Sequence, residues 1–465
     1  MTFGLEQHII DKIISVFEAN AKVDKAYVFG SRAKGNYRPD SDIDIAIKGI
    51  DITLDDILKM SVAFEDKGIK NKIDLIDYTS IKEPALQEHI DRVGIEFYSR
   101  WKEYILGDVI NLKRGYDLAS QNRKAGSIPI FSSSGITDHH NVSMKEGPGV
   151  ITGRYGTIGK VFYTDEPYWP LNTTLYVQNF RGNLPKYIFY FLQGLDFEKY
   201  SDKSAVPGVN RNELHKEIVV LPPLPEQTAI ASILSSLDDK IDLLQRQNIT
   251  LEQLAETLFR QWFVEEAEES WEVVKLEKLG KIICGKTPSK KIADYFNGEI
   301  PFIKIPDMHG NTFVFDSEDS LTIEGLDSQQ NKTIPPKSIC VSCIATVGLV
   351  VMNAKTAQTN QQINSIIPAK EVYRYFLYLK MLSMKDDLLA MASGGTATDN
   401  LNTGDFSKID IQLPDQNKLN DFHETIHPIF EKIYTNHTQI RTITQTRDTL
   451  LPKLMSGEVR VALDN

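Results

Sequence analysis

The segment from Glu226 to Phe263 reads EQTAIASILSSLDDKIDLLQRQNITLEQLAETLFRQWF. Its apolar positions are separated by alternating steps of four and three residues, once Asn248 and Ala255 are placed in the two gaps. This heptad pattern is typical of a helix that packs along another helix. We therefore predict a helix of about 38 residues, which at about 1.5 Å per residue spans roughly 55 Å. Its apolar positions are Ile230, Leu234, Leu237, Ile241, Leu244, Leu251, Leu258 and Trp262.

A second copy of this pattern lies near the C-terminus, 192 positions further along the chain. The shift maps Leu221-Pro222 onto Leu413-Pro414 and Thr257-Leu258 onto Thr449-Leu450 without a gap. Because the repeat extends beyond the helices, one shared design is favoured over two unrelated amphipathic helices on separate cores. The second frame consists of Phe422, Ile426, Ile429, Ile433, Asn436, Ile440, Ile443, Arg447, Leu450 and Leu454.

Individual residues refine the prediction of two long helices. Asn248 and Asn436 are polar positions in an otherwise apolar seam, and such residues fix the register at some cost in stability. Pro222 and Pro414 stiffen the chain before each helix. Pro428 falls inside the second pattern, so we expect either a kink or a late helix start there.

Composition limits the class of protein. A length of 465 residues predicts about three domains. No apolar run approaches the roughly 20 residues that span a membrane, and no basic stretch followed by an apolar core predicts a signal peptide. Three cysteines indicate a reducing compartment, so we expect a cytoplasmic protein without a membrane partner. Cys340 and Cys343 lie in an apolar run and are interpreted as buried strand cysteines rather than zinc ligands.

The net charge of −11 speaks against a chain coated in basic patches for nonspecific nucleic-acid binding. It does not exclude DNA binding through local clusters of basic residues, or as part of a larger assembly.

Residues 1–98 form a first predicted unit of alternating helices and strands. Helical spacing covers Leu5 to Phe17 and Leu54 to Phe64. Strands are expected at 26–29, 41–47 and 72–77, and 30–35 is expected to be a loop.

Carboxylates gather on the predicted strands of this unit. Asp42 and Asp44 are two residues apart, so both point to one face while their neighbours point into the core. They repel each other unless a cation lies between them. Asp74, on another strand, could complete an oxygen site suited to Mg²⁺. Asp77 is an alternative third ligand, but its odd spacing from Asp74 allows only one of the two to join the site.

The turn Gly30-Ser31 follows a strand, and its backbone N–H groups could hold a triphosphate. With the carboxylates, this is equipment for metal-assisted nucleotidyl transfer. The combined pattern resembles the minimal nucleotidyltransferase domain of the polymerase β superfamily: Gly30 to Gly35, Ser41 to Asp44, then Asp74. The resemblance implies that Asp42, Asp44 and Asp74 are catalytic metal ligands, that Gly30 and Ser31 bind the nucleotide, and that Mg²⁺ and a nucleoside triphosphate are required. The alternative is a degenerate, purely structural domain.

Residues 101–264 and 271–461 are two copies of one design, joined by an acidic hinge. Trp101 and Trp271 open the copies, and Gly115 matches Gly285 at a shift of 170. By the helices the shift is 192, so the second copy carries about twenty extra residues in its middle. The predicted divisions are 1–98, 101–222, 223–264, 271–413 and 414–461. Each copy is thus a strand-rich domain that ends in a long helix.

Gly280 to Thr287 matches the letters of a P-loop. That mechanism needs a helix that opens at Lys286-Thr287, and Pro288 biases Thr287 away from helical geometry. We therefore expect no nucleotide cofactor in the repeated region.

The two copies resemble the specificity subunit of type I restriction–modification systems. The residues that carry the resemblance are Trp101, Leu106-Gly107-Asp108-Val109 and Gly115, Thr152 to Gly159, Leu221 to Gln227, Leu237 to Ile241, Gly285 to Ser289 and Ile300 to Lys304. The second copy departs from the pattern at Pro414-Asp415-Gln416, which is a shortened form of Pro222 to Gln227.

The resemblance implies a mixed α/β and α+β multidomain fold: a nucleotidyltransferase-like domain, then two target-recognition domains separated by two long antiparallel helices. Each recognition domain would read half of a bipartite target in double-stranded DNA, and the helices would set the spacing of the half-sites. The implied partners are two methyltransferase subunits and a restriction subunit that translocates DNA. The alternative is a chain that is primarily a nucleotidyltransferase and uses the repeat as a targeting scaffold.

Polar and basic residues in loops are the candidate DNA contacts, although any one of them is more often a solvated surface residue. Arginine and lysine would contact phosphates or guanine, and glutamine would contact adenine. The candidates are Arg154, Lys160, Lys203, Arg211, Lys286, Lys304, Lys355 and Gln361.

Overall fold

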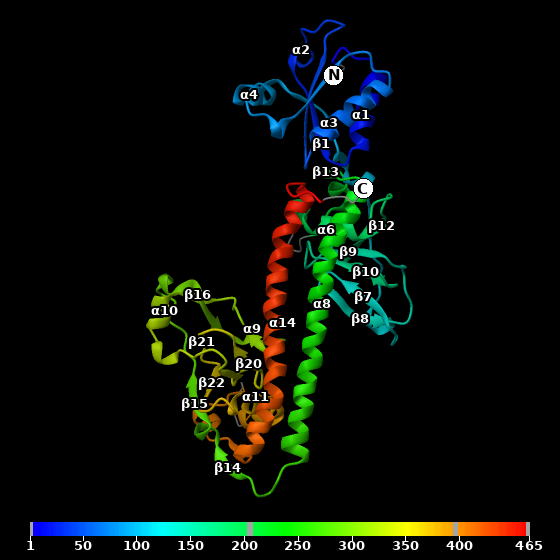
Figure 1. Cartoon of the computed structure of the whole chain (residues 1–465). Coiled ribbons are helices and arrows are strands. Elements are labelled where there is room, and N and C mark those ends of the chain that lie inside the picture. Colours follow the sequence, from blue (N-terminus) through cyan, green and yellow to red (C-terminus); the bar gives the residue numbers. More distant parts are fainter. Residues whose placement is uncertain (1–2, 202–207, 394–398, 462–465) are drawn as a thin grey trace. The chain divides into compact units, whose positions relative to one another are not determined.

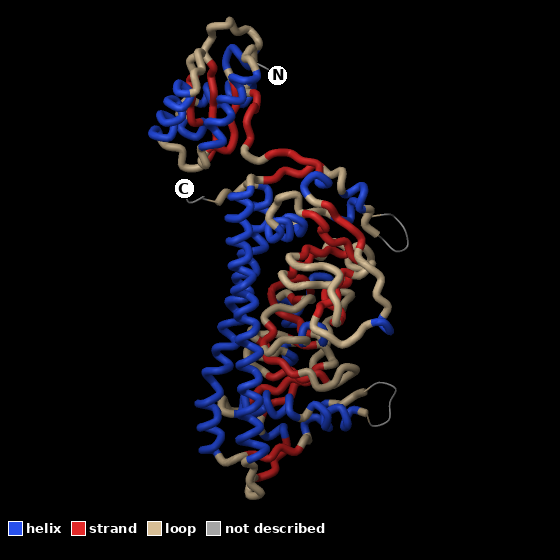
Figure 2. The backbone as a smooth tube through the Cα atoms, turned by 90° about the vertical axis from the view of Figure 1, so that its right-hand side faces the viewer, coloured by secondary structure: helices blue, strands red, loops and turns tan. Residues whose placement is uncertain are grey.

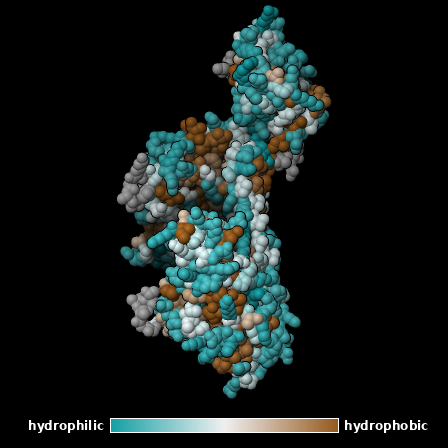
Figure 3. All heavy atoms as spheres, turned by 90° about the vertical axis from the view of Figure 1, so that its left-hand side faces the viewer, coloured by the Kyte–Doolittle hydropathy of each residue, from teal (hydrophilic) through white to brown (hydrophobic). Residues whose placement is uncertain are grey.

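The computed structural model describes residues 3–201, 208–393 and 399–461 (Figure 1). The chain divides into two compact units, residues 1–238 with 445–465 and residues 239–444. Hydrophilic side chains cover most of the face drawn in Figure 3, with hydrophobic groups between them. In the described part of the chain no helix combines the length and the apolar character needed to cross a membrane.

Two long helices pack along each other, as the heptad repeat predicts, and run antiparallel, as the family resemblance implies (Figures 1 and 2). α8 spans Leu224–Arg260 and α14 spans Gln416–Ser456. In the first unit the start of α8 meets the end of α14, where Arg447 Nη1 lies 2.8 Å from Asp238 Oδ1. In the second unit the end of α8 meets the start of α14, where the rings of Phe259 and Phe422 lie 6.3 Å apart. The predicted fold class is therefore confirmed.

The two polar seam residues face each other across the helix pair. Asn436 Nδ2 donates to Asn248 Oδ1 at 2.8 Å, and both side chains are buried. Asn248 Nδ2 and Asn436 Oδ1 have no partner, so the amide pair makes one of its two available bonds. α14 continues through Pro428, and the late helix start considered above does not occur, because buried Phe422 and Ile426 already hold the first turns in the core.

Each recognition domain builds its hydrophobic core on one stretch of the helix pair. In the first unit, Ile230 and Leu234 of α8 and Leu454 of α14 belong to the core of the first domain. In the second unit, Phe259 of α8 and Phe422 of α14 belong to the core of the second domain. The helices are thus core elements of both domains.

The first recognition domain has sheets of order β10-β9-β12-β6, β11-β7-β8 and β13-β5. The second has β15-β22-β19-β20-β17, β18-β16-β21 and β14-β23. The second copy's extra residues contribute α9, β17 and α10 between β16 and β19. Bounds in the first domain are β5 Lys102–Ile105, α5 Leu106–Val109, β6 Asn111–Arg114, β7 Ile128–Ser132, β8 Gly135–His140, β9 Gly149–Gly153, β10 Val161–Thr164, β11 Trp169–Pro170, β12 Thr174–Asn179, α6 Pro185–Gln193, α7 Arg211–Leu214 and β13 Ile218–Leu221. Bounds in the second are β14 Glu272–Lys275, β15 Gly280–Cys284, β16 Phe296–Ile303, α9 Ile305–Met308, β17 Phe313–Val314, β18 Ser320–Leu321, α10 Ile323–Asp327, β19 Ile339–Ser342, β20 Val350–Asn353, β21 Gln358–Thr359, β22 Ile363–Pro368, α11 Tyr373–Ser383, α12 Lys385–Ala392, α13 Thr403–Ser407 and β23 Asp410–Leu413.

Gly115 and Gly285 each allow a close crossing of two backbone segments in their own domain. A Cβ on Gly115 would lie 2.1 Å from the Leu171 carbonyl oxygen, and one on Gly285 would lie 2.1 Å from that of Asn360. Only glycine allows two backbone segments to pass so closely. Lys286 N donates to Thr359 O at 2.9 Å and no helix opens there, so the P-loop resemblance is one of letters only.

The predicted buried cysteines are found. Cys340 lies in β19 and Cys343 directly follows it, and both are buried free thiols. Burial raises the pKa of Cys340 to about 12 and that of Cys343 to about 11.

The N-terminal domain is a four-stranded sheet of order β3-β2-β1-β4. Apolar residues of α1 and α3 pack on one face of the sheet, with Phe17, Ile45 and Phe64 in the core. The segment 30–35, expected to be a loop, instead contains the short helix α2, which Gly35 ends in the left-handed conformation at φ 73°. The elements are α1 Gln7–Ala19, β1 Val23–Val28, α2 Gly30–Lys34, β2 Ile43–Gly49, α3 Leu54–Asp66, β3 Ile73–Asp77, α4 Pro84–Val93 and β4 Ile95–Ser99.

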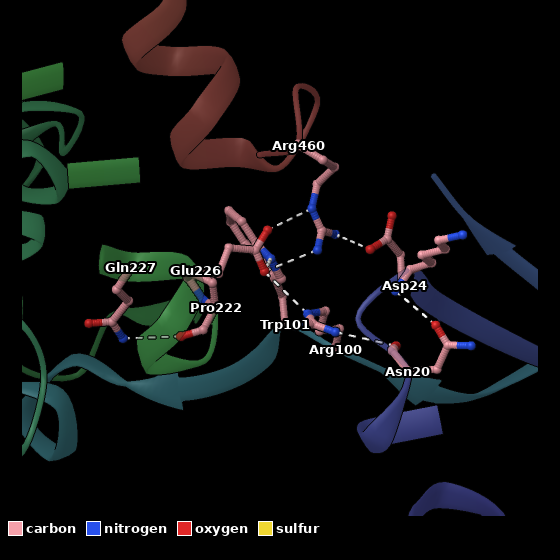
Figure 4. A network of polar contacts seen from close by, with 9 residues as sticks. Asn20, Asp24, Arg100, Trp101, Pro222, Glu226, Gln227 and Arg460 are labelled. Carbon is pink, nitrogen blue, oxygen red and sulfur yellow. Dashed lines mark hydrogen bonds and ion pairs between the residues drawn. The ribbon is translucent and has the colours of Figure 1, made fainter. Parts of the chain in front are cut away.

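A buried ionic network joins this domain to the first recognition domain (Figure 4). Glu226, in the first turn of α8, is 1% exposed and accepts a hydrogen bond from Trp101 Nε1 at 3.0 Å. Arg460 donates to both of its carboxylate oxygens, at 2.7 and 3.0 Å. Arg460 Nη1 also lies 2.7 Å from Asp24 Oδ1 on β1, and Arg100 Nε lies 3.4 Å from Glu226. One glutamate therefore connects α8, the segment after α14 and, through Arg460, the N-terminal domain.

We expect the substitution N436L to lower the free energy of unfolding of the second unit by about 1–3 kcal/mol, because it leaves the buried Asn248 amide without its partner. N248L/N436L should regain most of that loss, since both polar groups are then gone. Calorimetric unfolding of the two single variants and the double variant measures the coupling. Purely additive losses would contradict a paired role.

We expect E226Q to destabilise the first unit by about 3–5 kcal/mol, because Arg100 loses its carboxylate partner and Arg460 keeps only that of Asp24. The matched control is E217Q, which breaks the more exposed pair of Lys199 and Glu217 at 3.2 Å. The control should change the free energy of unfolding by about 1 kcal/mol or less. Equal thermal shifts for the two variants would show that the Glu226 network is not special.

Candidate functional site

The parallel pairing of β2 with β3 places two of the predicted carboxylates side by side. Asp44 is the register partner of Asp74, on the sheet face opposite the core residues Ile43 and Ile45. Asp42 precedes β2 by one residue and is exposed. The sequence pattern thus brings the three predicted ligands to one end of one sheet face.

Gly30 makes room for this group. Its φ is +67°, and a Cβ there would lie 2.1 Å from Asp44 Oδ2. Both facts favour glycine, because other residues are strained at positive φ and would displace the carboxylate. Ser31 follows in the first turn of α2 and is half-buried. The predicted phosphate-binding turn therefore touches the predicted metal ligand.

The carboxylates disfavour one another's charge. Burial, and then the negative charges of Asp74 and Asp42, raise the pKa of Asp44 above its usual value. Lys72 and Arg32 oppose the shift only in part. A bound cation would relieve this repulsion.

The donor set fits a hard cation such as Mg²⁺, which prefers carboxylate oxygens. As the side chains lie, no group of three or more His, Cys, Asp or Glu residues is placed to hold a metal in residues 3–201, 208–393 and 399–461. One reason is that Lys72 Nζ lies 2.6 Å from Asp74 Oδ1 and draws this carboxylate to itself. Lys72 is exposed, so its side chain has open solvent to move into.

Asp77, the alternative third ligand, serves another purpose. It is buried, and its carboxylate accepts hydrogen bonds from Thr79 N at 3.0 Å and Thr79 Oγ1 at 2.8 Å. It lies opposite Ile47 in the register, on the core face of the sheet. This leaves Asp74 as the third member of the group.

Arg32 is a positioning residue that sequence reasoning did not single out. It is 2% exposed, and its guanidinium donates to the carbonyls of Ser41 at 2.7 Å, Asp42 at 3.1 Å and Phe3 at 2.9 Å. It therefore holds the segment that carries Asp42 against the rest of the domain. An arginine in a turn ordinarily suggests a solvated surface residue, and only the tertiary structure shows this one to be buried.

The candidate DNA contacts differ in availability. Lys160 and Lys286 are exposed. Lys304 lies 2.9 Å from Asp319, and Lys355 lies 3.2 Å from Asp316, so acidic neighbours already compensate both cations.

The remaining candidates lie in the recognition domains at varied positions. Arg154 stacks on the ring of Tyr155, 4.4 Å from its centroid. Arg211 begins α7 and is half-buried. Lys203 lies outside the described residues.

A polar pair recurs at equivalent places in the two domains. After the first matched glycine, Asp117 accepts a hydrogen bond from Asn172. After the second, Thr287 Oγ1 donates to Gln361 Oε1 at 2.8 Å. The same backbone crossing that needs Gly115 and Gly285 thus orients a side-chain amide in each domain. Of the sequence candidates, the structure brings Gln361 and Lys286 together at this crossing.

Comparisons with known proteins agree with this repeated architecture. The family described as "Type I restriction modification DNA specificity domain" matches residues 98–253 and 268–445. The chain belongs to the type I restriction–modification specificity family. The HindI specificity subunit of Haemophilus influenzae is 33% identical over 458 residues, which cover 78% of this chain and 100% of that relative.

Two further relatives of this specificity subunit are more distant. The MjaIX specificity subunit of Methanocaldococcus jannaschii is 27% identical over 325 residues, covering 63% of this chain and 74% of the relative. The crystal structure of the type I S subunit from M. genitalium covers 76% of this chain and 96% of its own, with a TM-score of 0.55 and 15% identity. That likeness shows the shared fold.

The N-terminal domain of this specificity subunit is similar to a second family. Residues 11–103 match the family described as "Polymerase beta, Nucleotidyltransferase". The resemblance drawn from Gly30 to Gly35, Ser41 to Asp44 and Asp74 is therefore confirmed at the level of the domain. The catalytic and metal-binding roles of individual residues stay predictions.

We expect D44N to raise the melting temperature of the metal-free protein, because it removes a carboxylate whose charge is disfavoured by burial and by its neighbours. Mg²⁺ should raise the melting temperature of the original chain and leave that of D44N unchanged. Differential scanning fluorimetry across a magnesium titration measures both effects. The matched control is D40N, which removes an exposed carboxylate two residues before Asp42 and should retain the magnesium response.

Proposed function

We propose that this chain reads a bipartite target in double-stranded DNA as the specificity subunit of a type I restriction–modification complex. In this complex it docks two methyltransferase subunits and a restriction subunit that translocates DNA. The observation that carries the proposal is that two copies of one recognition domain share their cores with one antiparallel helix pair. Such a helix pair can act as a ruler between two half-sites. We place the complex in the cytoplasm, consistent with the three free thiols.

The repeated amide positions support reading of bases by the two domains. Gln361, exposed and held by Thr287, and Asn172, held by Asp117, present amides at equivalent crossings. Asparagine and glutamine amides can form two hydrogen bonds with adenine in the major groove. Exposed lysines such as Lys160 and Lys286 are suited to phosphates, which position the protein without specifying sequence.

We further propose that the fused N-terminal domain transfers a nucleotide to a hydroxyl group of a protein or nucleic acid. Asp42, Asp44 and Asp74 would hold Mg²⁺, which supplies charge neutralisation of the phosphates and of the acceptor oxygen. Gly30 and Ser31 would bind the phosphates of a nucleoside triphosphate, and Arg32 would keep Asp42 in place. The alternative is that nucleotidyl transfer is the chain's main activity and that the repeated region targets it. All three carboxylates are present, and this supports the proposal that the N-terminal domain is active.

The deciding experiment is selection from a randomised duplex library by this chain co-purified with its methyltransferase subunit. We expect a bipartite motif with a gap of fixed length. Q361E should alter the preference in one half-site, because a carboxylate can no longer donate to adenine N7, and should leave the other half unchanged. A stable complex that selects no motif would contradict the specificity proposal.

The same preparation separates the two candidate activities. D42N/D44N should abolish incorporation of labelled nucleotide in the presence of Mg²⁺ while the selected motif stays the same. If it also abolishes the biological effect of the system, nucleotidyl transfer is the main activity. If restriction and modification persist, DNA recognition is the main activity.

A further inference from the structure

The outer face of α3 in the N-terminal domain carries an unpartnered apolar stripe. Leu54, Leu58 and Val62 are 72%, 55% and 56% exposed. They are spaced four residues apart, so they lie above one another on successive turns of the helix. The opposite face of α3 packs in the domain core, where Met60 and Phe64 are buried. Isolated exposed leucines are ordinary, but a stripe of three marks an interaction surface.

The helix that carries this stripe is held firmly at both ends. At its start, Thr53 and Asp56 form a capping box, and Lys22 Nζ lies 2.7 Å from Asp56 Oδ2. These bonds lower the pKa of Asp56 to about 2. At its end, Lys12 Nζ donates to the Lys67 carbonyl at 2.7 Å. A partner would therefore meet a preformed helix and lose little free energy in ordering it.

Acidic residues surround the stripe. Asp51, Asp55, Glu65 and Asp66 are exposed around its two ends. Beside the stripe on the helix, Lys59 is paired with Asp55 at 2.7 Å, and the exposed Lys67 and Lys70 follow the end of the helix. A second copy of α3 packed antiparallel on the first would bring Glu65 and Asp66 against Asp51 of the other copy. Like charges across an interface disfavour that pairing and favour a basic partner.

We propose that the α3 stripe docks an amphipathic helix of a partner protein, one with a single apolar stripe flanked by lysine or arginine. Three apolar residues on successive turns match the spacing by which one helix recognises another. The acidic rim favours basic flanks on the partner and disfavours a second copy of this chain. The surface lies on the domain layer away from Asp44 and Asp74, because α3 packs on the core face of the sheet. The inference is independent of the DNA-reading proposal.

The test uses the full chain and two synthetic helical peptides as probes, measured by fluorescence anisotropy. The peptides share one leucine stripe and differ only in flanking residues, lysine in one and glutamate in the other. We expect the lysine peptide to bind at least tenfold more tightly. L54Q/L58Q should weaken its binding at least tenfold, and both residues are exposed, so the fold should persist. The matched control is I323Q, at a residue 71% exposed on α10, which should change nothing.

Reversing the charge of the acidic residues tests the charge preference separately from the apolar contacts. E65K/D66K should shift the preference from the lysine peptide toward the glutamate peptide. Equal binding of the two peptides, or binding that L54Q/L58Q leaves intact, would overturn the proposal. A dimer of the chain in sedimentation, dissociated by L54Q/L58Q, would also overturn it. The occupant of the stripe would then be a second copy.

Discussion

The antiparallel seam of α8 and α14 is the constraint on which both recognition domains depend. Each domain is a set of short strands with several small sheets, and such sheets do not close a core by themselves. Ile230 and Leu234 complete one core, and Phe259 with Phe422 completes the other. A slip of the helices by one turn would therefore disturb both domains, not only the seam. The buried Asn248–Asn436 bond resists such a slip, because any other register leaves both amides among apolar residues.

The N-terminal domain shows the opposite arrangement, in which charges are held together at a cost. The β2–β3 register places Asp44 beside Asp74, and Gly30 leaves space for the carboxylate rather than for a side chain. A purely structural domain would gain stability by losing one of these carboxylates. Proteins keep such destabilising groups mainly at functional sites. Arg32, buried to hold the Asp42 segment, further indicates that the position of the carboxylates matters.

Periodicity and internal repetition made most of the fold predictable. The heptad pattern predicted the two long helices. The shift that relates Trp101 to Trp271 and Gly115 to Gly285 predicted two copies of one domain. The parts that escaped prediction depend on tertiary contacts. Residues 30–35 were expected to be a loop, but Gly30 to Lys34 form α2, which Gly35 ends at positive φ, and buried Arg32 anchors this helix. Pro428 suggested a kink or a late helix start, yet α14 begins at Gln416, because the core contacts of Phe422 and Ile426 stabilise its first turns more than the loss of one hydrogen bond costs. The burial of Arg32 and the partners of Lys304 and Lys355 have no signal in a single sequence.

The link between the N-terminal domain and the first recognition domain limits how far the two can move apart. β4 ends at Ser99 and β5 begins at Lys102, so only Arg100 and Trp101 connect the domains. Both residues lie against Glu226, and Arg460 extends the same network to Asp24. A flexible tether would let the nucleotidyltransferase domain search for its acceptor over a wide volume. A two-residue connection with a buried ionic network does not, so in the proposed nucleotidyl transfer the acceptor would have to come to the domain. A rigid docking surface such as the α3 stripe is the kind of feature that a domain held in this way needs, because recognition of the partner then replaces the search.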